Sequence, residues 1–251
     1  MLSEGKIRSL TVVIPILNEE AIIEKSLTTL SDVLKTICLD YEIVVVDDGS
    51  TDRTAEILKK LALSIGRLKI LRNSRNEGLG GALCHGFKHA AKDVVFYIDA
   101  DMPFQYAEVL RAVKILEESR ADGVAGFRNN REQEPFFRRL SSMAYNGCVS
   151  CLYGIKMLDI NCAFKLMKRN ALKQLDLKAK GSFIDAEWMV RAAYGGYKIQ
   201  ELGVEYYPRP QSSSRLFRLR PIATAFWEMI KFFPDIRRLK GPASQDPQAC
   251  R

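Results

Sequence analysis

The chain has 251 residues, of which 47% are hydrophobic, so it is long enough and apolar enough for one large α/β domain with a well-filled core. Its formal net charge of +8 favours an acidic partner such as a nucleotide or an anionic lipid surface, whereas no recognition motif for nucleic acid accompanies that charge. No apolar run approaches the roughly 20 residues of a membrane span, and the six cysteines have no regular spacing, so we expect a cytoplasmic protein with reduced thiols.

The first half of the chain alternates strand and helix patterns. We expect strands at residues 10–14, 41–46, 68–71 and 94–98, with helices at 19–36, 53–64, 80–91 and 107–118. Strands that alternate with helices of this length form right-handed crossovers, so they predict a mostly parallel central sheet flanked by helices. Ligands of such sheets bind at the edge where the strands end.

The pattern changes after residue 121. The expected extended segments are 123–125, 159–167 and 198–207, and the expected helices are 136–153, 184–194 and 222–233. We therefore predict a single domain over residues 1–240. It would comprise a nucleotide-type half (8–121), a substrate-specific half (122–216) and an amphipathic C-terminal helix (217–240), with 241–251 as a disordered tail.

Two carboxylates follow the apolar strand 94–98. Asp99 and Asp101 lie two residues apart, so on an extended chain both side chains point into one small volume. Two like charges held this close are costly without a cation, and oxygen ligands of this kind suit Mg²⁺ or Mn²⁺. A solvated Asp-x-Asp turn is the alternative interpretation.

Polar residues also follow the first two strands. Pro15, Asn18 and Glu19 end the first strand, and Asp47 and Asp48 end the second. In a parallel sheet these residues share one edge with the pair after the fourth strand. This acidic edge suits hydrogen bonds to a base and a ribose, with a metal neutralising a diphosphate.

Two other patterns are weaker. Residues 78–81 supply glycines for a dinucleotide site, but the third glycine position of that fingerprint holds Leu83. Cys148 and Cys151 have the spacing of a redox or zinc half-site, but no second pair accompanies them. We expect these two cysteines to be buried thiols in a helix.

Several motifs, taken in order, resemble a known family. In the first half they are Val12-Val13-Ile14-Pro15 with Asn18-Glu19, Val44-Val45-Val46-Asp47-Asp48-Gly49-Ser50-x-Asp52, Asn76-x-Gly78 and Asp99-Ala100-Asp101. In this the chain resembles the inverting family 2 glycosyltransferases, whose fold is the nucleotide-sugar-binding GT-A fold. The second half is similar to the branch that glycosylates polyprenyl phosphates, such as dolichyl-phosphate mannose or glucose synthases. Its matching pieces are Arg128, Arg139-x-x-Ser142, Asp159 to Lys165 and Arg209-x-x-x-x-Ser214-Arg215.

The resemblance, which covers about residues 8–216, implies a role for each matching residue. It places in the base and ribose pocket Pro15, Asn18, Glu19, Asp47 and Asp48. It makes Asp99 and Asp101 the metal and diphosphate motif, and it assigns the acceptor phosphate to Arg128, Arg139 and Ser142. Closure over the donor diphosphate would fall to Arg209, Ser214 and Arg215. Family synthases often carry a glutamine ligand two residues after the second aspartate; here Pro103 occupies that position, so Gln105 is the candidate third ligand.

The implied activity is transfer of mannose or glucose from a GDP- or UDP-hexose to a polyprenyl phosphate. It would need Mg²⁺ or Mn²⁺ and would take place peripherally on the cytosolic face of a membrane, with a membrane-anchoring subunit as a candidate partner. A lipid phosphate is already ionised near neutral pH and needs no strong base, whereas a saccharide hydroxyl acceptor would need one, and Asp185 or Glu187 is the candidate. The other alternative is a non-catalytic nucleotide-sugar-binding or membrane-adaptor protein.

Overall fold

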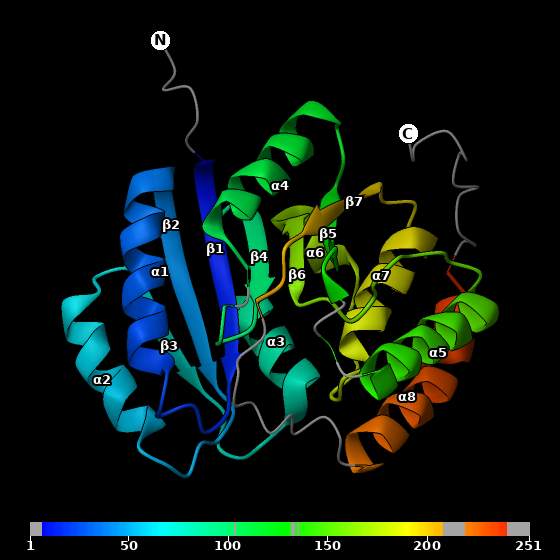
Figure 1. The fold of residues 1–251 in the computed structure, drawn as a ribbon, viewed down its shortest axis with the longest axis horizontal. Coiled ribbons are helices and arrows are strands. Elements are labelled where there is room, and N and C mark those ends of the chain that lie inside the picture. The colour runs from blue at the N-terminus through cyan, green and yellow to red at the C-terminus, as the bar shows by residue number, and fades with distance from the viewer. Residues whose placement is uncertain (1–6, 103, 132–133, 135, 208–218, 240–251) are drawn as a thin grey trace.

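One seven-stranded sheet forms the centre of the protein (Figure 1). The computed structural model describes residues 7–102, 104–131, 134, 136–207 and 219–239. The strand order is β3-β2-β1-β4-β6-β5-β7. In chain order the strands are β1 (Ile7–Ile16), β2 (Cys38–Asp47), β3 (Leu68–Arg72), β4 (Val94–Ile98), β5 (Gly123–Arg128), β6 (Phe164–Lys168) and β7 (Ile199–Val204). Strand β6 runs antiparallel to β4 and β5, and the other strand pairs are parallel, so the predicted mostly parallel sheet is confirmed.

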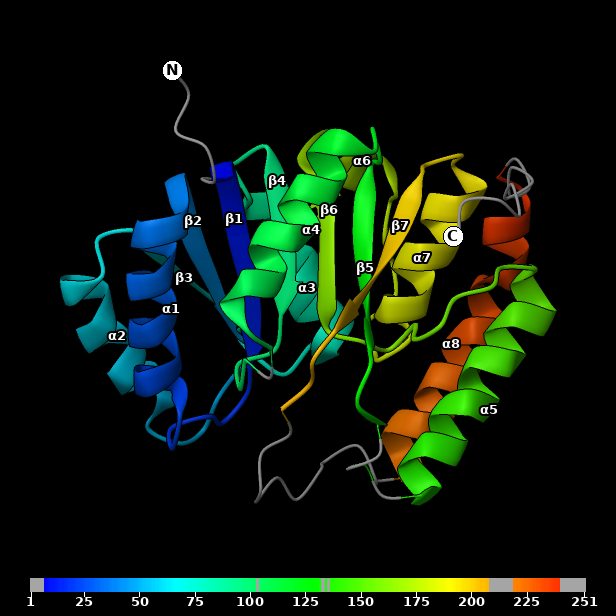
Figure 2. The ribbon, with the colours of Figure 1, turned by 45° about the horizontal axis from the view of Figure 1, so that its top comes forward.

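Helices cover both faces of the sheet (Figures 1 and 2). They are α1 (Ile23–Ile37), α2 (Thr54–Ser64), α3 (Gly78–His89), α4 (Tyr106–Glu118), α5 (Phe136–Tyr153), α6 (Arg169–Gln174), α7 (Ile184–Tyr194) and α8 (Leu219–Arg237). Neighbouring residues of β1 point to opposite faces, so Val12 joins the core under α1, α2 and α4, and Val13 joins the core under α3 and α5 to α8.

The expected segment 159–167 is only partly a strand. Pairing begins at Phe164, because residues 159–163 form a turn in which the Cys162 amide donates to the Asp159 carbonyl. The short helix α6 follows β6 directly and was not predicted from the sequence. A helix of six residues is too short to show a clear apolar period.

Cys148 and Cys151 lie on the outer side of α5, and both are exposed. The prediction of buried thiols is therefore wrong. The inner side of this helix carries Tyr145, Val149 and Tyr153 instead, and these three residues join the core. The i, i+4 and i+8 spacing of those apolar residues left the two cysteines facing solvent.

Helix α8 packs on the domain beside α5, and the two helices lie side by side in both views (Figures 1 and 2). Its inner residues Ala225, Met229 and Ile236 are buried in the core. The carboxylate of Glu228 accepts hydrogen bonds from the backbone amides of Lys180 and Gly181, at 2.9 and 3.0 Å. Among the described residues, no helix has the length and apolar content to cross a bilayer.

Candidate active site

The ends of β1, β2 and β4 bring the predicted acidic loops to one edge of the sheet. Strand β1 lies between the other two, with Ile16 opposite Asp47 and Val13 opposite Tyr97. Strand β6 continues the sheet beyond β4 and places Lys165 opposite Tyr97. The sheet thus sets the first-half acids beside a basic residue of the second half.

Three carboxylates form the acidic centre of this edge. The Tyr97 hydroxyl donates to Asp99 Oδ1 at 3.2 Å. Burial, together with the negative charges of Asp101 and Asp185, raises the pKa of Asp99 to about 7. The structure therefore brings Asp185, from the first turn of α7, to the pair that follows β4.

A buried lysine neutralises part of this charge. Lys165 is 1% exposed, and its Nζ donates to Asp185 Oδ1 and to the Cys162 carbonyl, both at 2.6 Å. Burial raises the pKa of Asp185, and the adjacent ammonium opposes that rise. Beyond the family resemblance, no pattern in the sequence indicated a role for Lys165. Its position becomes evident only from the antiparallel pairing of β6 with β4.

The aspartates after β2 brace the surrounding loops. Asp48 accepts hydrogen bonds from Asn73 Nδ2 at 2.7 Å and from the amides of Glu77 and Gly78, each at 2.9 Å. Asp47 accepts from the Ser50 amide at 2.8 Å. These contacts tie the loop after β2 to the start of α3, so both residues are present at the predicted edge but are engaged within the chain.

The residues after β1 join the same set of loops. Asn18 has a positive φ of 53°, and its Oδ1 accepts from the Thr51 amide at 2.8 Å. The Glu19 amide donates to Thr54 Oγ1 at 2.9 Å, and Pro15 is paired with Val46 in the sheet. The loops after β1 and β2 are thereby joined into one wall of the site.

Arg128 is held by acidic partners. Its Nε and Nη2 donate to Asp159 at 2.6 and 3.0 Å, and its Nη1 donates to Glu134 at 2.6 Å. Burial lowers the pKa of this guanidinium, but the hydrogen bonds and charge of Asp159 together with the charge of Glu134 outweigh it, so the net pKa is raised. An acceptor phosphate would have to compete with two carboxylates for Arg128, so its role stays a prediction. Arg139 lies exposed on α5.

Three further predicted sites have different outcomes. Gln105 is exposed, and its amide nitrogen donates to the Tyr207 hydroxyl at 2.9 Å. Glu187 is fully buried and accepts from Arg191 Nε and from the amides of residues 178 and 179, so its carboxylate is committed to the chain. Outside the described residues lie Arg209, Ser214 and Arg215.

The fit of the site to a divalent cation depends on the aspartates after β4. Within the described ranges, no three His, Cys, Asp or Glu side chains form a ready-made metal group. Asp101 nevertheless lies close enough to Asp99 for its charge to raise the pKa of Asp99. That repulsion, between oxygen ligands at the carboxyl end of a buried strand, is what a bound Mg²⁺ or Mn²⁺ relieves.

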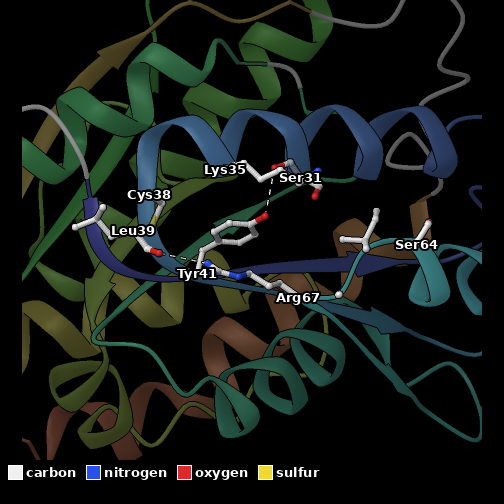
Figure 3. Close-up of a pocket in the computed structure, with 9 residues that line it drawn as sticks. Ser31, Lys35, Cys38, Leu39, Tyr41, Ser64 and Arg67 are labelled. Atoms are coloured by element: carbon white, nitrogen blue, oxygen red, sulfur yellow. Dashed lines mark hydrogen bonds between the residues drawn. The ribbon is translucent and has the colours of Figure 1, made fainter.

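A separate small pocket of about 270 Å³ lies near the start of β2 (Figure 3). The ends of α1 and α2 flank it, and Arg67 lies over the ring of Tyr41, 4.6 Å from its centroid. The Tyr41 hydroxyl donates to the Ser31 carbonyl at 3.4 Å. Strand β2 runs from this pocket toward Asp47, so the pocket and the acidic edge are at opposite ends of the sheet.

A mostly parallel sheet with acidic loops along its carboxyl edge defines an α/β protein of the class that binds ligands where its strands end. Residues 11–176 match the model of the family described as "Glycosyl transferase family 2". The chain belongs to this family, and the family resemblance predicted from its motifs is confirmed.

Named relatives agree with this assignment. The chain is 29% identical to glycosyltransferase AglD of Haloferax volcanii over 83% of its own length and 34% of the relative's. It is 34% identical to the undecaprenyl-phosphate 4-deoxy-4-formamido-L-arabinose transferase of Edwardsiella ictaluri, over 67% of the chain and 52% of the relative. The chain thus spans between a third and about half of the length of these relatives.

The fold itself matches that of a mannosyltransferase from Pyrobaculum calidifontis, solved in complex with GDP-Man and Mn²⁺. The two share 22% sequence identity with a TM-score of 0.62, over 93% of this chain and 69% of the other. The predicted GT-A fold is thereby confirmed.

Proposed function

We propose that the protein is an inverting glycosyltransferase that moves a hexose, mannose or glucose, from a nucleotide diphosphate sugar to a polyprenyl phosphate. The observation that carries the proposal is the acidic centre after β4, where Asp99 and Asp101 face Asp185 and its buried partner Lys165. Two similarities support the substrates. A relative is named for transfer to undecaprenyl phosphate, and a structural neighbour was solved with GDP-Man.

A divalent cation fits the donor half of this proposal. Asp99 and Asp101 would hold Mg²⁺ or Mn²⁺, which would supply positive charge against the diphosphate of the leaving nucleotide. The loops braced by Asp47 and Asp48 would bind the base and the ribose. The braces fix those loops before the donor arrives, so less ordering entropy is lost on binding.

The state of Asp185 favours a phosphate acceptor. Its Oδ1 already accepts a hydrogen bond from the buried Lys165 ammonium at 2.6 Å, so this oxygen is not free to take a proton from an acceptor hydroxyl. A lipid phosphate arrives ionised and needs no proton removed, so a site without a free base is sufficient for it. Arg139, exposed on α5, is the candidate cation that would meet this phosphate first.

The outer faces of α5 and α8 support contact with a membrane. Large apolar side chains are exposed on both helices, namely Phe136, Leu140, Met143, Trp227 and Ile230. Lys231 lies over the Trp227 ring at 4.7 Å, so a cation adjoins the apolar surface, as suits an anionic bilayer. We propose peripheral binding to the cytosolic face through these two helices, with or without a separate anchoring subunit.

Transfer to a saccharide hydroxyl is the second candidate. It is favoured by the pKa of Asp99, which burial raises to about 7, because a carboxylate with such a pKa can act as a general base. Cation binding to Asp99 would lower that pKa, and Asp99 would then be a weaker general base.

The deciding experiment offers the purified protein two acceptors, polyprenyl phosphate in vesicles and a panel of soluble saccharides, with Mn²⁺ or Mg²⁺ and labelled nucleotide hexoses. Label in the lipid fraction supports the proposal, and label in the saccharides supports the second candidate. The variant Arg139→Ala should raise KM for the lipid phosphate, whereas Lys59→Ala, an exposed cation on α2, should not. Nucleotide-sugar binding with transfer to neither acceptor would favour a non-catalytic binding role and refute the proposal.

A further inference from the structure

Helix α5 carries three buried polar atoms without a hydrogen-bond partner in the described part of the chain. They are Ser142 Oγ, Tyr145 Oη and Asn146 Oδ1. Residues at i, i+3 and i+4 lie on one face of a helix, so the three atoms belong to one strip of α5. Buried polar groups in native proteins are almost always paired, and each unpaired one is costly. Three on one strip indicate a missing common partner.

The chemistry of that partner follows from Asn146. Its Nδ2 donates to the Leu158 carbonyl at 3.1 Å, which fixes the orientation of the amide because a carbonyl can only accept. The unpaired Oδ1 is therefore an acceptor and needs a donor. Phosphate oxygens of an ionised lipid phosphate cannot supply one. Hydroxyl groups can, and they also pair with the hydroxyls of Ser142 and Tyr145, which both donate and accept.

The strip lies close to the acidic centre. The Tyr145 ring is 8% exposed and packs edge-on against Phe226 of α8, with centroids 5.9 Å apart. Burial raises the pKa of Tyr145, and the negative charge of Asp185 raises it further, so the hydroxyl stays protonated. The charge of Asp185 thus acts on both Tyr145 and Asp99. The Leu158 carbonyl that holds Asn146 belongs to the residue before Asp159, the partner of Arg128.

We propose that Ser142, Tyr145 and Asn146 form a subsite that binds hydroxyl groups of the transferred sugar and so determines which hexose is accepted. This inference builds on the proposed function and deepens it. It assigns the inner face of α5 to the glycosyl group, whereas the family resemblance gave Ser142 to the acceptor phosphate. The side of the sugar away from the nucleotide would then be recognised by the second half of the chain.

The test uses Tyr145→Phe, which removes one hydroxyl and keeps the ring against Phe226, and Ser142→Ala. Each variant is assayed with the nucleotide hexose that the wild type uses and with a series of analogues, each lacking one sugar hydroxyl. We expect each variant to lose about tenfold in kcat/KM with the full sugar. With one particular analogue the variant and wild type should be equal, since the same hydrogen bond is missing from both. Binding of the nucleoside diphosphate alone should stay unchanged.

Stability separates this role from a structural one. Removal of an unpaired buried hydroxyl should leave the midpoint of thermal unfolding unchanged or raise it. The matched control is Tyr194→Phe, because that hydroxyl is buried but donates to the Tyr153 carbonyl at 2.9 Å. The Tyr194→Phe variant should have a lower midpoint of thermal unfolding and should discriminate between sugars as the wild type does.

Two results would overturn the subsite. One is wild-type discrimination over the whole analogue series in both variants. The other is an effect confined to KM for the lipid phosphate, which would show that the strip contacts the acceptor phosphate and not the sugar. Failure of the proposed function would look different, because the wild type itself would then transfer no sugar.

Discussion

The buried pair of Lys165 and Asp185 gives the sharpest prediction for stability. The lysine is 1% exposed and the aspartate 5%, and their charged atoms are 2.6 Å apart. The substitution Lys165→Met keeps the length of the side chain and removes its charge, so the Asp185 carboxylate is left buried without compensation. Breaking a buried pair in this way costs about 3–5 kcal/mol. That is a large share of a total stability of about 5–15 kcal/mol.

The free energy of unfolding is measured by urea denaturation. The matched control is Lys35→Met, whose partner Asp32 lies at 2.9 Å while the two side chains are 62% and 65% exposed. An exposed pair is worth less than about 1 kcal/mol, so the control should differ little from the wild type. Adding Asp185→Leu to Lys165→Met should recover part of the loss, since no unpaired charge remains buried. Equal losses for the two lysine variants would refute the reasoning.

Three further outcomes are expected. Asp101→Asn should abolish sugar transfer, while circular dichroism and the unfolding midpoint stay close to those of the wild type. Because the pKa of Asp99 is raised to about 7 and a cation binds the ionised form, Mn²⁺ affinity measured by calorimetry should fall by up to about tenfold per pH unit below that value and level off above it. A pH-independent affinity would contradict this site. Gly80→Ala should destabilise by about 1–3 kcal/mol, since its Cβ would lie 2.0 Å from the Ala179 carbonyl oxygen, whereas Gly147→Ala in α5 meets nothing within 4 Å and should be neutral or stabilising. Similar losses in both glycine variants would exclude that contact as the cause.

The fold of the first half was predictable because its strands and helices carry strong periodic signals. Strands β1 to β4 were all anticipated within a few residues, as were the acidic residues that follow them. The second half was harder, since strand β6 reverses direction and its pairing depends on contacts far apart in the sequence. For that reason the sequence suggested a role for Asp185 but none for Lys165 beyond the family resemblance, although the Lys165 ammonium donates to the Asp185 carboxylate.

The sequence also did not predict which residues pair with the charged side chains of the site. The sequence pointed to Arg128 as a phosphate ligand, but a single sequence does not reveal that Asp159 and Glu134 converge on its guanidinium. The strip on α5 did have a signal, because polar side chains at 142, 145 and 146 share the side of the helix that carries the buried Val149 and Tyr153. Such a strip is worth testing as a ligand contact whenever it faces the core.

The anchoring of α8 determines where this unit of the chain can be cut. Glu228 holds the amides of Lys180 and Gly181, and the Lys180 carbonyl in turn accepts from the Gly80 amide at the start of α3. A fragment that stopped at residue 176, where the family match ends, would lack Lys180 and Gly181 as well as the Glu228 carboxylate that holds their amides. Truncation should therefore loosen the glycine-rich entrance of α3, far away along the sequence. For expression or for fusion to other modules, the practical boundary lies beyond Ile236, which is fully buried.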